Sequence, residues 1–394
     1  MKQFGFAPHR TPWCWAVAGA LALGLAACGG GDDDGYGTPV TTTSTLTASL
    51  SGDQETTPTI TGGLGSGTLT LTMPSRALSG SISINGMSAT ADRAHVHQGD
   101  VGTNGGVIVD LAESSPGSGT WSVPAGTMLT EGQATAFAAG GLYFNAHTPN
   151  NPSGEIRGQI GREIYAAQLS ASQEVPTNSS AATGVGFLSL DPVTKRFTVR
   201  MTLTGIAATV AHIHTGNVGA NGGVAFALTE TAANSGIWAA APDATLTDAQ
   251  ITTLRAGGFY FNAHSATYTG GEIRGQIARN VRYAQLNAAQ EVPTNASTAT
   301  GVGTLVIDPA TRAVVSGGIT LTGMTATVAH IHTGAPGANG PVAIGLESAG
   351  NGVWNVPANS TFTAEQFRAF KQGNLYFNAH SAAFTGGEIR GQIR

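Results

Sequence analysis

Three sets of three histidines account for all but one of the ten histidines in this 394-residue chain. In each set, two histidines flank one apolar residue, and the third follows 50, 50 and 48 residues after the second. The sets are His95, His97 and His147; His212, His214 and His264; and His330, His332 and His380. Three neutral imidazoles suit copper or zinc, and they leave one coordination position open.

The spacing predicts how each set is arranged. Residues i and i+2 of a β-strand point to the same face, so His95 and His97 are expected side by side if they lie on a strand. If the strand that carries His147 is a neighbour, three imidazoles converge. Two interpretations stay open: a metal site, or structural histidines that bond loop carbonyls beside a glycine-rich turn.

A second repeated motif, Gly-Glu-Ile-Arg-Gly-Gln-Ile, places an arginine ten residues after the third histidine. Its charged pairs are Glu155 and Arg157, Glu272 and Arg274, and Glu388 and Arg390. One interpretation is an arginine that guides an anion to a metal while the glutamate orients it. The other, which we favour, is an ion pair within the sheet that holds the last strand.

The elements that position these residues recur with the motifs, which predicts three domains rather than a solenoid of short repeats. We place them at residues 46–161, 164–279 and 282–394. The second copy predicts strands at 165–171, 184–190, 196–203, 210–214, 224–228, around 238, 258–264 and 271–277. Capping boxes at 130–133, 247–250 and 363–366 predict one short helix per copy. We therefore expect an all-β protein with three tandem Greek-key antiparallel sandwich or barrel domains, either immunoglobulin-like or superoxide-dismutase-like.

The N-terminus has the pattern of an export signal. Lys2 and Arg10 precede a short apolar run, and Leu25-Ala26-Ala27-Cys28 matches a bacterial lipobox. The sequence predicts a signal peptide over 1–27, lipidation of Cys28 and a flexible tether over 28–45. Two or three acyl chains would hold the protein on a membrane, and Gly29 after the cysteine favours the outer membrane or cell surface of the envelope.

Composition excludes several classes of function. The formal net charge is −5 and no cluster of Lys and Arg occurs, which argues against nucleic acid as a partner. Of the two cysteines, only Cys28 follows the signal peptide, so no disulfide framework is expected. No Ser-His-Asp arrangement is recognisable, and we expect no catalytic residues.

At Ala-His-Ile-His-Thr-Gly, Tyr-Phe-Asn-Ala-His and Gly-Glu-Ile-Arg-Gly-Gln-Ile, the chain closely resembles the CHRD domain, first described in chordin. The resemblance spans nearly all of residues 46–394 and implies an extracellular β-sandwich. Chordin binds secreted growth factors; that role is not carried over to a chain with a bacterial signal, although an extracellular protein partner remains an expectation.

A weaker resemblance is to copper/zinc superoxide dismutase, a Greek-key barrel that holds copper with a His-Val-His pair. The matching positions are His95-Val96-His97, His147 and Arg157. No zinc ligands, bridging histidine or disulfide have counterparts, so the resemblance implies at most a copper-only site.

The leading hypothesis is a non-enzymatic, lipid-anchored envelope protein whose three domains form a binding or structural module that holds metal. The alternatives are a copper-dependent redox enzyme of the dismutase type and an adhesive spacer with structural histidines.

Overall fold

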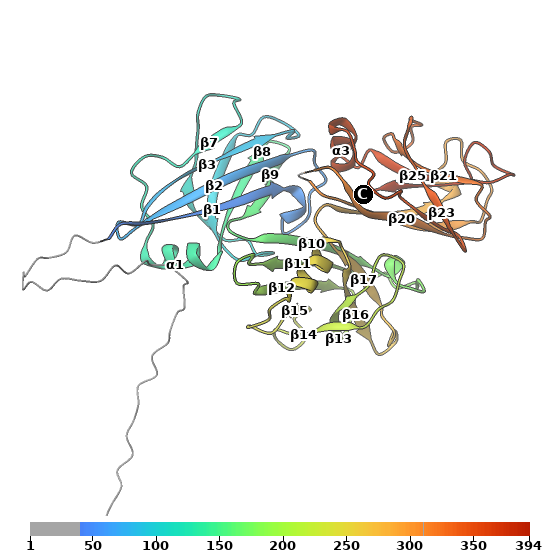
Figure 1. The fold of residues 1–394 in the computed structure, drawn as a ribbon, viewed down its shortest axis with the longest axis horizontal. Helices are drawn as coiled ribbons and strands as arrows, with labels where there is room; N and C mark the ends of the chain where they lie inside the picture. Colours follow the sequence, from blue (N-terminus) through green and yellow to red (C-terminus); the bar gives the residue numbers. More distant parts are fainter. Residues whose placement is uncertain (1–39, 310) are drawn as a thin grey trace, which may run out of the picture. The chain divides into compact units, whose positions relative to one another are not determined.

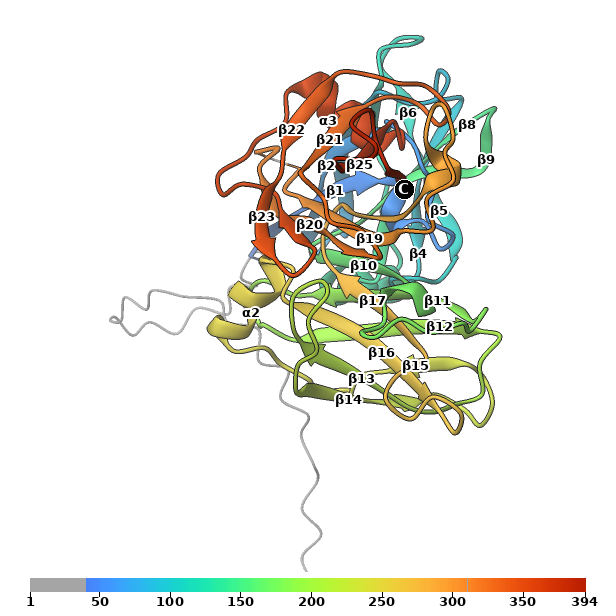
Figure 2. The ribbon, with the colours of Figure 1, turned by 90° about the vertical axis from the view of Figure 1, so that its right-hand side faces the viewer.

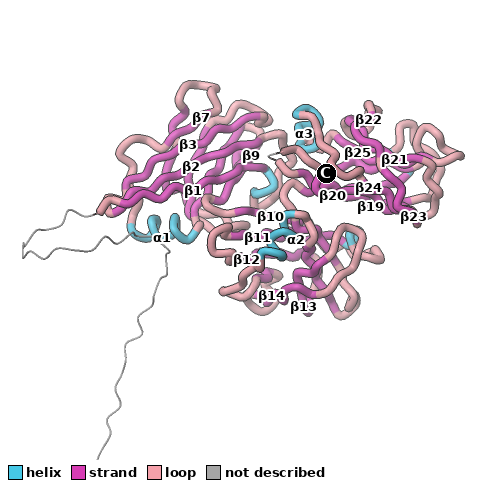
Figure 3. The backbone as a smooth tube through the Cα atoms, viewed as in Figure 1, coloured by secondary structure: helices cyan, strands magenta, loops and turns pink. Residues whose placement is uncertain are grey.

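The fold was obtained as a computed structural model that describes residues 40–309 and 311–394. The predicted signal peptide, Cys28 and residues 28–39 of the tether lie outside the described residues. The tether prediction is wrong for residues 42–45, which belong to the first strand, Thr42–Ser51, and pair with the next strand of the sheet. Strands dominate each of the three copies (Figure 3). Among the described residues, no helix is long and apolar enough to cross a membrane.

The first copy is a nine-stranded antiparallel sheet in the order β5-β4-β8-β9-β1-β2-β3-β7-β6. Figure 1 shows β1, β2 and β3 side by side in this sheet. Its strands are β1 (Thr42–Ser51), β2 (Leu64–Met73), β3 (Ala77–Asn85), β4 (Arg93–Gln98), β5 (Gly106–Asp110), β6 (Ala112–Glu113), β7 (Thr120–Ser122), β8 (Leu142–Thr148) and β9 (Asn151–Gln159).

The second copy is a closed antiparallel barrel in the order β10-β11-β12-β15-β14-β13-β16-β17. Its strands are β10 (Glu163–Ser170), β11 (Thr183–Leu190), β12 (Phe197–Thr204), β13 (Ala208–Thr215), β14 (Val224–Glu230), β15 (Ile237–Ala239), β16 (Phe259–Ser265) and β17 (Ile273–Ile277). Each predicted strand of this copy is confirmed, with small shifts at the ends.

The third copy repeats the first as a nine-stranded sheet in the order β22-β21-β25-β26-β18-β19-β20-β24-β23. Its strands are β18 (Val281–Asn287), β19 (Thr300–Ile307), β20 (Val314–Thr322), β21 (Val328–Thr333), β22 (Val342–Gly345), β23 (Glu347–Gly350), β24 (Val353–Asn355), β25 (Leu375–His380) and β26 (Ile389–Ile393).

The connection that makes the fold a Greek key comes in the middle of each copy. In the second copy the chain leaves β12 and enters β13, which β15 and β14 separate from it in the barrel. As a result β13 lies between β14 and β16 (Figure 2). This crossover brings the strand with two histidines beside the strand with the third.

Alternation explains why these segments form strands around a core. In β12, Phe197, Val199, Met201 and Leu203 are buried, and the residues between them are exposed or half-buried. The fully buried members of each main hydrophobic cluster come from one copy. Each copy therefore encloses its own core.

The three predicted helices are confirmed at α1 (Glu131–Ala139), α2 (Asp248–Arg255) and α3 (Ala364–Lys371). Each begins with the predicted capping box, formed by Thr130 and Gln133, Thr247 and Gln250, and Thr363 and Gln366. Each copy also has a short 3₁₀ turn after its first strand, at Gly52–Gln54, Ala171–Gln173 and Ala288–Gln290.

Candidate metal centre

The first histidine cluster lies on the face of the sheet that points away from the core. On β4, Ala94 and Val96 are buried in the core, so His95 and His97 project from the opposite face. β4 pairs with β8, with Arg93 opposite His147. Residues opposite one another share a face, so the three histidines gather there.

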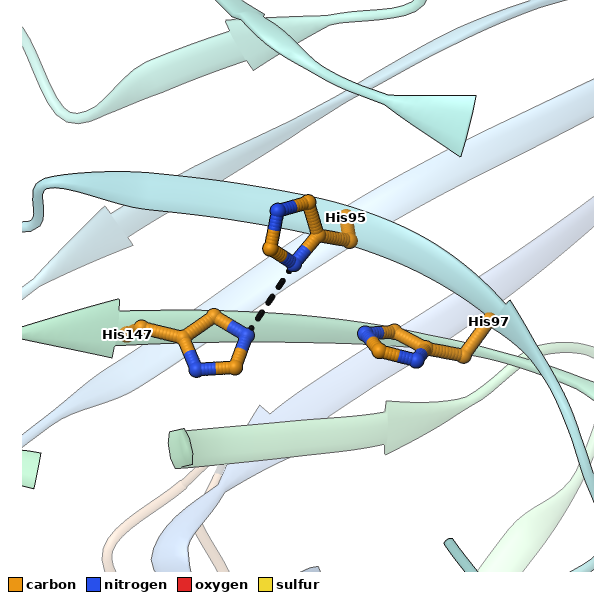
Figure 4. A group of neighbouring side chains, drawn as sticks. All are labelled: His95, His97 and His147. Atoms are coloured by element: carbon orange, nitrogen blue, oxygen red, sulfur yellow. Dashed lines mark hydrogen bonds between the residues drawn. The ribbon is translucent and has the colours of Figure 1, made fainter. Parts of the chain in front are cut away.

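The imidazoles converge closely in all three copies. In the first, His95 Nδ1 lies 3.1 Å from His147 Nε2, and the His97 ring points into the same space (Figure 4). The matching distances are 3.4 Å between His212 and His264 and 3.3 Å between His330 and His380. Each trio offers one nitrogen per residue within 4.8 Å of the others. The structure thus places all nine predicted histidines in three clusters, one in each copy.

Backbone carbonyls determine which nitrogens are free. His97 Nδ1 lies 2.9 Å from the Gly105 carbonyl oxygen, and His147 Nδ1 lies 3.2 Å from that of Pro152. A carbonyl only accepts, so each Nδ1 carries the proton and each Nε2 keeps its lone pair. Metal-bound histidines are commonly held this way. The same contacts recur at His214, His264, His332 and His380.

One nitrogen in each cluster is buried without a hydrogen-bond partner: Nε2 of His97, of His214 and of His332. A buried polar atom left unpaired costs free energy, and a metal ion at the centre of the cluster would satisfy it. The residues present therefore fit a metal with three nitrogen ligands.

The electrostatics also suit a cation that needs neutral ligands. Burial, and after it the neighbouring His95, lower the pKa of His147 to about 4. Burial likewise lowers the pKa values of His95 and His97. Burial also lowers the pKa values of four counterparts in the other copies, namely His212, His264, His330 and His332. At neutral pH these imidazoles are uncharged, as metal ligation requires.

A stack of two further side chains supports the second histidine. The Tyr143 ring is parallel to the His97 ring to within 9°, with centroids 4.9 Å apart, and the Arg157 guanidinium carbon lies 3.5 Å from the Tyr143 centroid. His214 with Tyr260 and Arg274, and His332 with Tyr376 and Arg390, repeat this stack. Tyr143 is thus buried but lies beside the site rather than only in the core.

Arg157 is 1% exposed, and both of its terminal nitrogens donate hydrogen bonds within the protein. Its two terminal nitrogens donate to the carbonyl oxygens of Thr103 and Asp100, at 2.7 and 2.9 Å, and to Gln159 Oε1. The guanidinium holds the loop over residues 99–105, and three of its five N–H donors are used within the protein. Its burial lowers the pKa of Arg157 from the usual range.

The ion pair that we favoured within the last strand is wrong for the described residues. Glu155 is 0% exposed, and its carboxylate accepts from Ser88, Thr148 and Thr61 instead of pairing with Arg157. Glu272 and Glu388 accept from Ser180 and Ser297. The hydroxyls satisfy the carboxylate, and the arginine turns toward the tyrosine instead.

Gly105 is a site residue that sequence reasoning missed. Its carbonyl holds His97, and its N–H donates to the Tyr143 hydroxyl at 3.0 Å. A Cβ on Gly105 would lie 1.7 Å from the Gln98 carbonyl oxygen, so no other residue fits. Gly222 and Gly340 are equally confined. The recurrence of this glycine eight residues after the second histidine was the available signal.

The third copy keeps this arrangement despite one substitution. Pro341 stands where the other copies have Gly106 and Gly223, and a Cβ at either glycine would meet nothing within 4 Å. His332 Nδ1 accordingly keeps its 2.9 Å contact with the Gly340 carbonyl oxygen.

Sequence reasoning also missed a buried carboxyl group, which accepts a hydrogen bond from Asn145, the residue opposite His95 on β8. Asn145 Nδ2 donates to Glu55 Oε1 at 2.7 Å, and burial raises the pKa of Glu55 to about 7. Glu174 with Asn262 and Glu291 with Asn378 repeat the contact. The Gln-Glu dipeptide that recurs at 54–55, 173–174 and 290–291 was the signal in the sequence.

Comparison with known families agrees with this repeated arrangement. The CHRD domain matches residues 46–160, 165–277 and 282–393, which is most of the chain. A search of curated proteins found no match.

Proposed function

The chain belongs to the CHRD domain family and has three tandem copies of that domain, and we propose that each copy binds one transition metal ion through its three histidines. The observation that carries this proposal is the buried, unpartnered Nε2 of His97, repeated at His214 and His332. It points to a cation, because the protein offers that atom no hydrogen bond.

The donor set narrows the choice of metal to copper or zinc. All three donors are neutral imidazole nitrogens, which suit these metals better than magnesium or calcium, whose preferred ligands are oxygens. Three protein ligands leave a position for water or a small molecule. The function we infer is a tandem metal-binding module.

Metal content tests the proposal. Residues 29–394, expressed without the lipid and loaded separately with Zn²⁺ and Cu²⁺, should retain three ions per chain after desalting. His97→Ala should retain two. The variant His97→Ala/His214→Ala/His332→Ala is the control, and equal metal content in this control and the unsubstituted chain would refute the proposal.

The same sample separates the alternatives left by the sequence. A copper-loaded protein that consumes superoxide faster than the triple variant would establish the redox enzyme. A protein that retains no metal would leave the histidines as structural groups in a spacer.

We further propose that the module is exported and held in the cell envelope by lipid at Cys28. The support is the lipobox at 25–28, behind a basic and then apolar leader. Cys28→Ser should move the full-length protein from the membrane fraction to the soluble fraction. Continued membrane association of this variant would exclude lipidation at that cysteine as the anchor.

A further inference from the structure

The three clusters differ in the residue opposite the first histidine. On the strand that pairs with the His-x-His strand, Asp110 lies opposite His95, Ala227 opposite His212 and Gly345 opposite His330. Residues directly opposite one another share a face of the sheet. Only the first copy therefore has a carboxylate at this position.

The carboxylate lies on the side of the ring away from the cluster. Asp110 Oδ1 is 3.4 Å from His95 Nε2, while His95 Nδ1 faces His147 at 3.1 Å. The Asp110 side chain is 86% exposed, so it has room to close on the imidazole N–H. The His95 ring is thus placed between a carboxylate and the proposed metal position.

This arrangement selects the tautomer that a metal needs. A neutral imidazole carries one N–H, and His95 can offer Nδ1 to a metal only when the proton is on Nε2. A carboxylate beside Nε2 stabilises that tautomer and makes Nδ1 a stronger donor. Ala227 and Gly345 have no side-chain acceptor, so His212 and His330 lack this help.

The other charges near His95 do not cancel the effect. Among the charged groups that act on His95, Asp110 acts most strongly, ahead of Arg93 and Asp92, which have opposite signs. Arg157, behind Tyr143, has counterparts in the other two copies. The positions that match Arg93 are Val210 and Val328, which are partly exposed and uncharged.

We propose that the first copy is the high-affinity metal site of the three, and that Asp110 is the positioning residue that makes it so. This inference rests on the proposed metal-binding function. Its consequence is an order of filling: when metal is scarce, the ion occupies the first copy before the second and third. Outer ligand partners commonly change affinity 10- to 100-fold, and the exposure of Asp110 places its effect at about tenfold.

A competition titration tests the order. Residues 29–394 are titrated with Zn²⁺ against a chromogenic chelator. We expect one ion that binds about tenfold more tightly than the other two. Asp110→Ala should remove that difference and still bind three ions. Ala227→Asp is the matched gain-of-function variant and should produce a second tight site, and Asp110→Glu should retain the first.

A spectroscopic readout identifies which copy fills first. With one equivalent of Cu²⁺, His97→Ala should change the electron paramagnetic resonance spectrum much more than His214→Ala does, because a tenfold preference places most of the copper in the first copy. Asp110→Ala should spread the copper over three sites and broaden the spectrum, although it removes no ligand.

The outcomes separate this inference from the function on which it rests. Failure to bind any metal refutes both the metal-binding function and the order of filling. Three ions of equal affinity in the unsubstituted chain, or a tight site that survives Asp110→Ala, overturn the order of filling and leave the metal-binding function intact.

Discussion

Replacing Arg157 with methionine should destabilise the first copy by about 4 kcal/mol. The guanidinium is buried and donates to two loop carbonyls, and each charge-assisted bond contributes roughly 1.5–3 kcal/mol. Stacking on Tyr143 adds about 2 kcal/mol in a desolvated position. Relief of the guanidinium's own desolvation offsets part of this sum. For a domain of about 115 residues, roughly 4 kcal/mol corresponds to a fall in Tm of about 15 °C.

Tryptophan fluorescence can follow the first copy alone. Trp121, Trp238 and Trp354 are the only tryptophans in residues 29–394, one in each copy, and all three are buried. In a background with Trp238→Phe and Trp354→Phe, heating should expose Trp121 at a lower temperature when Arg157 is changed. The matched control is Arg274→Met, which alters the same stack in the second copy and should leave the Trp121 transition in place.

The reasoning fails if Arg157→Met lowers the Trp121 transition by less than about 2 °C, since a surface substitution usually changes the free energy of unfolding by no more than about 0.5 kcal/mol. Such a result would mean that the loop carbonyls find other partners and that the arginine does not hold the loop. That result would favour the other interpretation, in which Arg157 guides an anion to the metal.

Three further predictions concern the groups around the cluster. Because burial lowers the histidine pKa values, to about 4 for His147, protons should compete with Zn²⁺ below pH 6 rather than at the ordinary value of 6.5; zinc retention measured from pH 4 to 7 with a midpoint at 6.5 would contradict this. Burial raises the pKa of Glu55 to about 7, so its contribution to stability is complete below pH 4.5 and is lost as pH rises through 7. Followed by Trp121 fluorescence in the Trp238→Phe and Trp354→Phe background, Glu55→Gln should therefore abolish a loss of about 2 kcal/mol in urea unfolding of the first copy between pH 5 and 8; an equal loss in both proteins would show that the carboxyl is not responsible. Gly105→Ala should remove one bound metal ion, because a Cβ cannot fit beside the Gln98 carbonyl, whereas Gly106→Ala should keep all three ions.

The sequence by itself determined the features that depend on local geometry. The period of two in each strand put His95 and His97 on one face, because successive side chains of a strand alternate. The capping boxes specified where each helix begins, because the bonds span only three residues. The threefold repeat, read from identical motifs, specified the family and the all-β class.

Only the tertiary structure decided how the site is completed. That β8 lies beside β4 in the register that brings His147 to His95 follows from a crossover that local patterns do not record. The turn of Arg157 onto Tyr143, away from Glu155, depends on hydroxyls that satisfy the glutamate, and two of these, from Thr61 and Ser88, lie far from it in the chain. The pairing of Asp110 with His95 depends on register across the sheet. The sequence placed two histidines on one strand face, and packing between strands far apart in the chain made them part of a site.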